Sequence, residues 1–447
     1  MTTFRRYLAT ALHAQLCTPT RPQRPTHWRV SPVTNERTLT GSWISHAGRL
    51  SLMAAIVLAV LCSDWTVVGH VTVGFAAVIL AAVLAGVASF VDYRLEFDIA
   101  DLSFCLCLLC ISLSACFAVN TAVAFQTMDL WSVNGLAFFA CRRLIRNVRD
   151  LRPLAIAGLI AAAIASGSIQ ERIDQWGNYG RPSIGNDNTN YTAYCIAGLT
   201  LIHCLWYLIE RRSAFTKSVF TCGLLPYAYC LVALGSRGAL VAFGCVVCVT
   251  CLPFVVSVSV YRAAAVALLA GAILMSIGCF DGVLHKAGEV APGLRRVSQS
   301  DESLSGREDI WPDVRAIFVR QMWFGVGPGN TGLVSRRGVG AHNLLLSVAV
   351  EGGIIAIVSF GLLFGLLFRT IGPVCIGRRR VSVLFLFMVY WVPIAFSGHW
   401  ELAYLGWIVL AGVWQVGLAC RREHRLDEGV PGMRWKFRSG RYDGLLP

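Results

Sequence analysis

The chain has 447 residues and a formal net charge of +14, and its composition is that of a membrane protein. Hydrophobic residues make up 56% of the chain, charged residues only 14%, and the mean hydropathy is +0.61. Soluble domains contain roughly a quarter charged residues, so these values exclude an ordinary soluble multidomain protein. The apolar residues come in long runs instead of alternating with polar ones, which favours membrane-spanning helices.

The apolar runs predict an all-α fold, a polytopic membrane protein with about twelve transmembrane helices. The predicted helices cover residues 50–69, 70–91, 99–119, 121–141, 152–168, 189–209, 217–234, 237–257, 261–279, 344–368, 381–397 and 400–419. The first two and the last two are closely joined, and each pair is also compatible with one tilted span or a re-entrant hairpin. The number of spans therefore lies between about ten and twelve.

These boundaries divide the chain into successive parts. In order, they are a basic N-terminal arm (1–49), the first nine helices (50–279), a long connection (280–343), the last three helices (344–419) and a basic tail (420–447). The arm has no apolar core before a small-residue cleavage site, so we do not expect it to be a cleaved signal peptide.

Arginines gather in alternate connections and thereby predict the orientation of the chain. They crowd the arm, the connections at 142–152 and 211–217, the run 378–380 and the tail. Because short basic connections are retained in the cytoplasm, both termini are expected inside and the long connection outside. This topology accounts for most of the net charge, so we expect the lipid bilayer as a partner and no nucleic acid.

The 17 cysteines predict neither disulfides nor a metal site. None of them lies between residues 280 and 343, the longest segment assigned to the outside. Cys245, Cys248 and Cys251 have the spacing of metal ligands, but they lie in an apolar run without a neighbouring histidine or carboxylate. Buried thiols in such a run are ordinary packing residues.

The long connection contains a predicted amphipathic helix. Its apolar residues recur at helical spacing: Ile310, Trp311, Val314, Ile317 and Phe318. Ser305 with Glu308 resembles a capping box, whereas Pro312 favours a later start, with Asp309 as the cap and the proline in the first turn. With either start, the helix is expected at the membrane surface as a lid over the bundle.

Further along the same connection lie a glycine-rich turn and a histidine. Gly325, Gly327 and Gly329 predict either a plain turn or a turn whose backbone closely approaches a ligand or another loop. His342 and Asn343 stand just before an apolar run, where Asn343 is expected to cap the helix and His342 to lie at the edge of the membrane.

Three arginines share the predicted outer side with His342: Arg181, Arg237 and Arg307. Arg237 interrupts two apolar helices at their outer ends, where an arginine needs an anionic or carbonyl partner. Guanidinium groups bind phosphate oxygens bidentately, so converging arginines would suit a pyrophosphate headgroup.

The motifs in this half of the chain resemble those of the O-antigen ligase and polymerase superfamily, from about Arg181 to Phe360. The matching motifs are Ser236-Arg237-Gly238-Ala239, Gly306-Arg307-x-x-Ile310-Trp311, Phe324-Gly325-Val326-Gly327-Pro328-Gly329, Ala341-His342-Asn343-x-Leu345 and Glu351-Gly352-Gly353-Ile354-Ile355. The resemblance implies a GT-C-like membrane glycosyltransferase of the bacterial inner membrane, with its active site at the periplasmic face. The implied donor is a glycan linked to undecaprenyl pyrophosphate, and no cofactor is implied.

The resemblance also implies roles for individual residues. Arg181, Arg237 and Arg307 would hold the donor pyrophosphate, and His342 would orient or deprotonate the acceptor hydroxyl. Accessory candidates are Asn343, Glu351 and Asn188, the last in Asn186-Asp187-Asn188, where the family often has Asn-Pro-Asn. The chain contains no Asp-x-Asp triplet, which agrees with a metal-independent enzyme.

Several functions are compatible with these residues. The leading hypothesis is an O-antigen ligase that transfers the glycan to lipid A-core. A polymerase of O-antigen or exopolysaccharide, with a glycan acceptor, would use the same donor, as would a protein O-oligosaccharyltransferase. A single long outer segment favours the ligase, because polymerases often have two. The alternative that is not an enzyme is a transporter of lipid-linked glycans. A transporter would place its polar residues at mid-membrane, whereas here they gather at one face.

Overall fold

The structure is a computed structural model, and it describes only part of the chain. The described residues are 35–61, 66–68, 71–91, 97–176, 189–210, 214–252, 267, 271, 307–376, 381–398 and 403–428. The predicted helix 261–279, apart from residues 267 and 271, lies outside them. The chain divides into the units Met1–Leu39 and Thr40–Pro447, and the helix bundle belongs to the second unit.

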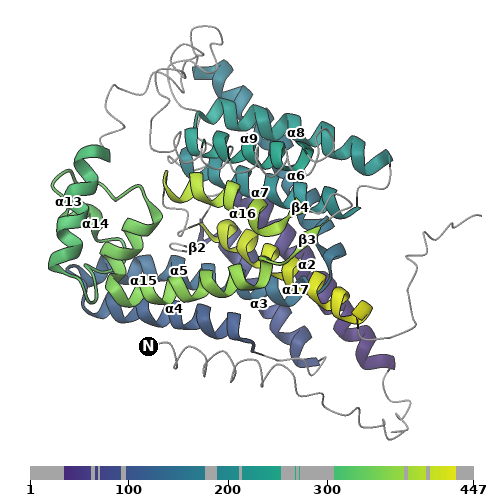
Figure 1. Ribbon diagram of the computed structural model, residues 1–447, viewed down its shortest axis with the longest axis horizontal. Helices are drawn as coiled ribbons and strands as arrows, with labels where there is room; N and C mark the ends of the chain where they lie inside the picture. The colour runs from purple at the N-terminus through teal and green to yellow at the C-terminus, as the bar shows by residue number, and fades with distance from the viewer. Residues whose placement is uncertain are drawn as a thin grey trace, which may run out of the picture. The chain divides into compact units, whose positions relative to one another are not determined.

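Helices dominate the described residues (Figure 1). In chain order they are α2 (Asn35–Leu61), α3 (Val73–Val91), α4 (Ile99–Cys116), α5 (Thr121–Leu144), the 3-10 turn η2 (Val148–Asp150), α6 (Leu151–Trp176), α7 (Thr189–Glu210), α8 (Ala214–Leu234), α9 (Arg237–Cys251), α13 (Arg307–Arg320), α14 (Thr331–Val334), α15 (Leu344–Ile371), α16 (Val383–Ala395) and α17 (Tyr404–Glu428). Two short antiparallel hairpins accompany them, formed by β1 (Thr66–Val68) with β2 (Val71–Thr72) and by β3 (Cys375–Ile376) with β4 (Val381–Ser382).

The prediction of a polytopic all-α membrane protein is confirmed. Every predicted transmembrane helix except 261–279 overlaps a described helix, but residues 66–68, 71–72 and 381–382, predicted as helix, form short strands. Among the described helices, 8 are long and apolar enough to cross a membrane, while α9 and α16 are apolar but shorter. Helix α2 begins at Asn35, earlier than the predicted residue 50, because the helix continues into polar sequence beyond the apolar run.

The bundle is built from helices that are distant in sequence. Helix α15 packs along α4, α17 packs along α5, and α16 packs against α9 (Figure 1). Trp407 of α17 lies in the core, with its ring centroid 4.8 Å from that of Phe104 on α4 and 5.9 Å from that of Trp131 on α5. Large aromatic residues therefore fill the space where α4, α5 and α17 meet.

One end of the bundle is held by buried and partly buried ion pairs, and we call it the basic end. Arg142, at the end of α5, is 5% exposed and bonds the carboxylate of Asp98, just before α4. Arg143 Nη2 lies 2.8 Å from the carboxylate oxygen Oδ2 of Asp101, whose side chain is fully buried. Arg49 of α2 pairs with Asp150 at 2.6 Å. These arginines, predicted as determinants of orientation, therefore also connect α2, α4, α5 and η2.

Burial and charge act in opposite directions on Asp98. Burial favours the neutral acid and would raise its pKa, but the Arg142 guanidinium and backbone N–H groups favour the carboxylate, and the pKa lies below its usual value. Asp98 is therefore ionised at neutral pH and also caps α4, because its side chain accepts bonds from the backbone N–H groups of Ala100 and Asp101.

The opposite end, which we call the loop end, carries residues 321–343. The end of α4 and the start of α5 lie there, since Asn120 hydrogen-bonds Asn330. Helix α17 runs parallel to α5, because Trp407 lies beside Trp131 and, further along both helices, Gln415 donates to the Arg142 carbonyl at the basic end. The start of α17 therefore points toward the loop end. So does the end of α16, which runs antiparallel to α15, with Phe387 beside Phe368 and Trp391 beside Phe364.

We predict that Arg142→Ala lowers the stability of the protein by on the order of 3 kcal/mol, because the fully buried Asp101 would keep only Arg143 as an ion-pair partner. Arg149→Ala is the matched control, since this exposed arginine lies in the same connection and its loss removes the same charge. The measurement is the thermal unfolding midpoint of the purified protein in detergent. Equal shifts for the two variants would show that charge, and not pairing, matters at this end.

Candidate functional site

The candidate site is organised by a break within α15. Gly353 has φ 67° and ψ −166°, which no helical residue adopts, so that α15 consists of two helical pieces. Such a break deprives neighbouring backbone groups of their helical partners. In a membrane-spanning helix these groups need other partners, because lipid offers none.

The predicted glycine-rich turn supplies those partners. The backbone N–H of Val326 donates to the Val350 carbonyl at 2.8 Å, and that of Gly327 donates to the Glu351 carbonyl at 3.0 Å. In the other direction, the N–H of Ile354 donates to the Met322 carbonyl at 2.8 Å. The turn is therefore more than a plain turn, but its backbone closely approaches the break in α15 and not the ligand or the other loop of the prediction.

Two glycines make this approach feasible. Gly325 and Gly353 both have positive φ, at 72° and 67°. A Cβ atom on Gly325 would lie 2.5 Å from the Glu351 carbonyl oxygen, and one on Gly353 would lie 2.3 Å from that of Trp323. Any other residue would therefore force the two backbones apart.

The end of α4 completes the junction. The Ser114 hydroxyl lies 2.5 Å from the carbonyl oxygens of both Phe324 and Glu351, and the N–H of Val119 donates to the Val326 carbonyl at 3.0 Å. Fully buried Asn330 accepts a bond from the N–H of Asn120 and donates to its carbonyl. Segments more than two hundred residues apart in the chain thus meet here.

Helix α13, which corresponds to the predicted amphipathic helix, covers this junction. Its buried residues Ile310, Val314 and Ile317 form a cluster with Val326, Ala341 and Val350. The helix begins at Arg307, so the prediction of a start at Asp309 is wrong, and Pro312 lies inside the helix. Trp311 Nε1 donates to the Ala341 carbonyl at 3.1 Å, which ties α13 to the residue before His342.

His342 is held in an uncommon backbone conformation. It has φ 47°, the one positive φ of a non-glycine residue among the residues that the structure describes. Outside glycine this region is sparsely populated, and such residues often mark functional sites. Asn343 caps α15, as predicted, by accepting a bond from the N–H of Leu346 at 3.1 Å. The backbone of His342 is thereby held between Ala341, which α13 bonds, and the start of α15, and the residue is half-buried.

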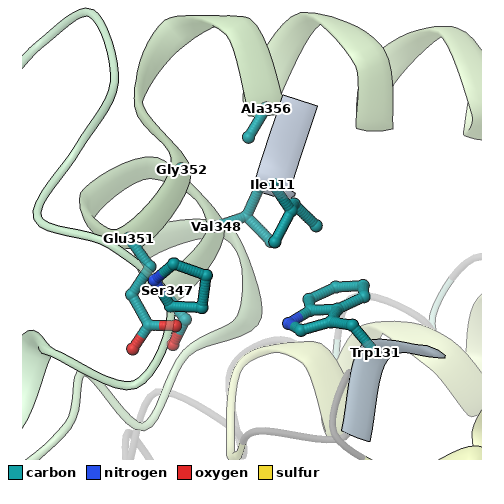
Figure 2. Close-up of a pocket in the computed structure, with 8 residues that line it drawn as sticks. Ile111, Trp131, Ser347, Val348, Glu351, Gly352 and Ala356 are labelled. Carbon is teal, nitrogen blue, oxygen red and sulfur yellow. The ribbon is translucent and has the colours of Figure 1, made fainter. Parts of the chain in front are cut away.

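A small pocket lies beside the break, with a volume of about 270 Å³ that includes space open to the surroundings. Its lining includes Ser347 and Glu351 of α15 and Trp131 of α5 (Figure 2). Glu351, predicted as an accessory residue, accepts a bond from the Thr331 hydroxyl at 2.9 Å. Neither Trp131 nor Ser347 was predicted, because a tryptophan and a serine within apolar helices carry no distinguishing pattern.

Arg237 lies at the loop end but in a different group of helices. It starts α9, directly between α8 and α9 as predicted, and is half-buried. The next residue, Gly238, packs so closely on Ser397 at the end of α16 that a Cβ atom would lie 2.7 Å from the serine Cβ. The fold thus brings Arg237 to the same end as His342, with Arg237 beside α16 and His342 beside α13.

The remaining predicted site residues are described only in part. Arg181 and Asn188 lie outside the described residues, and for Arg307 only the backbone, at the start of α13, is described. Within the described ranges, no group of three or more His, Cys, Asp or Glu residues has the geometry to hold a metal ion.

Comparison with known proteins agrees with this geometry. A family model described as O-Antigen ligase matches residues 222–361, which include Arg237, His342 and Glu351. The match confirms the resemblance to the O-antigen ligase superfamily over this part of the chain. The comparison with curated proteins gave no match.

We predict that Gly353→Ala disrupts the junction, because the new Cβ atom would meet the Trp323 carbonyl and the backbone would leave its positive φ. Gly361→Ala on the same helix is the control, since no atom lies within 4 Å of its Cβ position. Limited proteolysis between α13 and α15 should be faster in Gly353→Ala, with a lower unfolding midpoint, and unchanged in Gly361→Ala. Unaltered proteolysis of Gly353→Ala would contradict the role given to the break.

Proposed function

We propose, starting from the O-antigen ligase domain that this chain carries over residues 222–361, that the protein is a membrane glycosyltransferase. It transfers a glycan from undecaprenyl pyrophosphate to an acceptor hydroxyl. In its specific form the proposal is an O-antigen ligase, with lipid A-core as the acceptor, acting at the periplasmic face of the inner membrane with both termini in the cytoplasm.

The observation that carries this proposal is the placement of His342 within the matched region. Its positive φ and the neighbouring bonds of Ala341 and Asn343 fix the backbone that carries the imidazole. A neutral imidazole in this place is suited to accept a proton from a hydroxyl that arrives from the aqueous side.

The proposed reaction is a single displacement. The acceptor oxygen attacks the anomeric carbon of the donor sugar, and His342 takes the hydroxyl proton. The new carbon–oxygen bond forms as the bond from the anomeric carbon to the pyrophosphate oxygen breaks, and undecaprenyl pyrophosphate leaves with both electrons of that bond. Negative charge thus develops on the leaving group, which prepositioned cations stabilise.

Arginines are proposed to supply this stabilisation without a metal ion. Arg237, at the loop end, is the described candidate, and Arg181 and Arg307 are proposed with it on the resemblance. A planar guanidinium matches two phosphate oxygens at once, which a lysine ammonium does not.

Among related reactions, the ligase is favoured by the connections of the chain. Residues 280–343 form the single long connection between predicted spans, whereas polymerases of this type often have two. A polymerase of O-antigen or exopolysaccharide is the second candidate, and it would use the same donor and the same residues.

We predict that His342→Ala and Arg237→Ala abolish transfer while leaving the amount of folded protein in the membrane unchanged. Arg237→Lys keeps the charge but loses the bidentate geometry, so it should retain only a small part of the activity. Arg336→Ala serves as control, because this exposed arginine lies in the same half of the chain. The measurement is glycan transfer in membranes at matched protein levels, and full activity of His342→Ala or Arg237→Ala would remove that residue from the mechanism.

The ligase hypothesis and the polymerase hypothesis predict different lipopolysaccharide gel profiles after deletion of the gene. For a ligase, we expect bare lipid A-core on gels together with accumulated lipid-linked polymer, and a plasmid copy should restore the polymer to the core. Core carrying a single repeat unit would instead identify a polymerase. An unchanged profile would redirect the search to exopolysaccharide or glycoprotein.

A further inference from the structure

The outward side of α13 carries exposed apolar residues where the helix ends. Val319, Met322 and Trp323 are all exposed, Val319 by 67% and Trp323 by 63%. They belong to one continuous helical coil, because the N–H groups of Gln321 and Gly325 donate to the carbonyls four residues earlier. At spacings of three and four residues, the three apolar side chains lie on the same side of this coil. We call these three residues the apolar patch.

The apolar patch lies opposite the side of α13 that covers the junction. That side is formed by Ile310, Val314 and Ile317, which are buried. At about 3.6 residues per turn, the patch points roughly half a turn away from them. The end of α13 is thus apolar on two opposite sides, and a helix of this kind is normally covered on both. Three large apolar side chains gathered on one surface therefore indicate a partner other than water.

The docked loop holds the patch at the level of the last turn of α4. The N–H of Ile354 donates to the Met322 carbonyl, and the Ser114 hydroxyl of α4 bonds the carbonyl of Phe324, the next residue after the patch. Helix α4 has 18 residues and is apolar enough to cross a membrane. At about 1.5 Å per residue it is about 27 Å long, close to the roughly 30 Å of hydrocarbon in a bilayer. Its last turn, and the patch beside it, are therefore expected where the hydrocarbon ends.

The exposed apolar side of α4 continues into the patch. Leu109 and Leu113 are exposed on one side of this span, as side chains that face lipid are. Phe117 extends the same side to the end of the helix and is 58% exposed. Its ring stacks on that of Phe324, with the two centroids 4.5 Å apart, and Phe324 directly follows Trp323 in the chain. The patch therefore adjoins a surface that already faces lipid.

The residue types also fit the boundary of a membrane. Tryptophan is enriched where hydrocarbon meets headgroups. Arg315 and Arg320 are exposed on either side of Val319 along the helix, and arginines beside an apolar patch can reach headgroup phosphates while their stems cover apolar surface. Figure 1 shows α13 across the direction of α4 and α15, which is the orientation of a helix that lies along a membrane surface.

We propose that Val319, Met322 and Trp323 insert into the lipid leaflet at the loop end, with Trp323 at the boundary between the hydrocarbon and the headgroups. The partner is the phospholipid of the surrounding bilayer, so this contact does not depend on the proposed function. The turn that carries the patch also bonds the break in α15. Insertion into lipid and docking of the loop therefore stabilise each other.

The test is photo-crosslinking of the full-length protein in nanodiscs of phosphatidylethanolamine and phosphatidylglycerol. Trp323→p-benzoylphenylalanine introduces a group that, on irradiation, bonds to C–H groups within its reach, and mass spectrometry then detects the added mass of a phospholipid. Leu109→p-benzoylphenylalanine, in the middle of α4, is the positive control. Arg336→p-benzoylphenylalanine is the matched control outside the patch, since this side chain is 86% exposed and lies beside Asp313.

We expect phospholipid adducts at positions 323 and 109 in comparable yield, and loss of the adduct at position 336. Absence of an adduct at position 323, while position 109 gives one, would overturn the proposal. Equal yields at positions 323 and 336 would overturn it as well, because lipid would then reach any exposed position at this end.

A charged side chain provides a second test, because the interior of a leaflet excludes charge and water does not. In the same nanodiscs, Trp323→Asp should loosen the docked turn and speed limited proteolysis between α13 and α15. Gln321→Asp is the matched control, since Gln321 is exposed in the same turn but lies outside the patch, and the change adds the same charge. Equal rates of proteolysis in the two variants would contradict insertion of Trp323.

Discussion

The docking of the glycine-rich turn into the break of α15 is the interaction on which the rest of the site depends. A break in a membrane-spanning helix leaves carbonyl and N–H groups that lipid cannot satisfy. Here the backbones of Val326, Gly327 and Met322 supply the missing partners, and the hydroxyl of Ser114 adds a further bond from α4. The break is therefore stable only while the loop remains docked.

This constraint couples several parts of the protein that are separate in sequence. Because the loop is fixed to α15 and α4, it also fixes α13 above it, through the cluster around Val314 and Val326. The same loop continues to His342, whose backbone is held by the bonds of its two neighbours. A half-buried histidine in a loop would otherwise be free to adopt many orientations, and the proposed catalysis requires one.

The basic end shows a comparable double use of residues. Arginines that orient a membrane protein need only be present in a connection between spans. Arg142 and Arg143 are also paired with Asp98 and Asp101, and Arg142 lies 5.3 Å from the ring centroid of Trp414. Charge at one end thus anchors α4 and α5 to each other, while their other ends meet the loop, so both ends of these helices are fixed.

The sequence by itself determined the helical membrane fold, because the length of an apolar run is set by the thickness of the bilayer and can be counted. It also determined local features, such as the amphipathic helix around Val314 and the cap at Asn343, whose signals lie within a few neighbouring residues. Only the tertiary structure decided that Gly353 breaks α15 and that Trp131 faces Glu351 across a pocket. Those features depend on partners from distant parts of the chain. The backbone groups around the break bond a loop that starts about thirty residues earlier and Ser114 of α4, which precedes Glu351 by 237 residues. No local pattern in the sequence records which segments will meet.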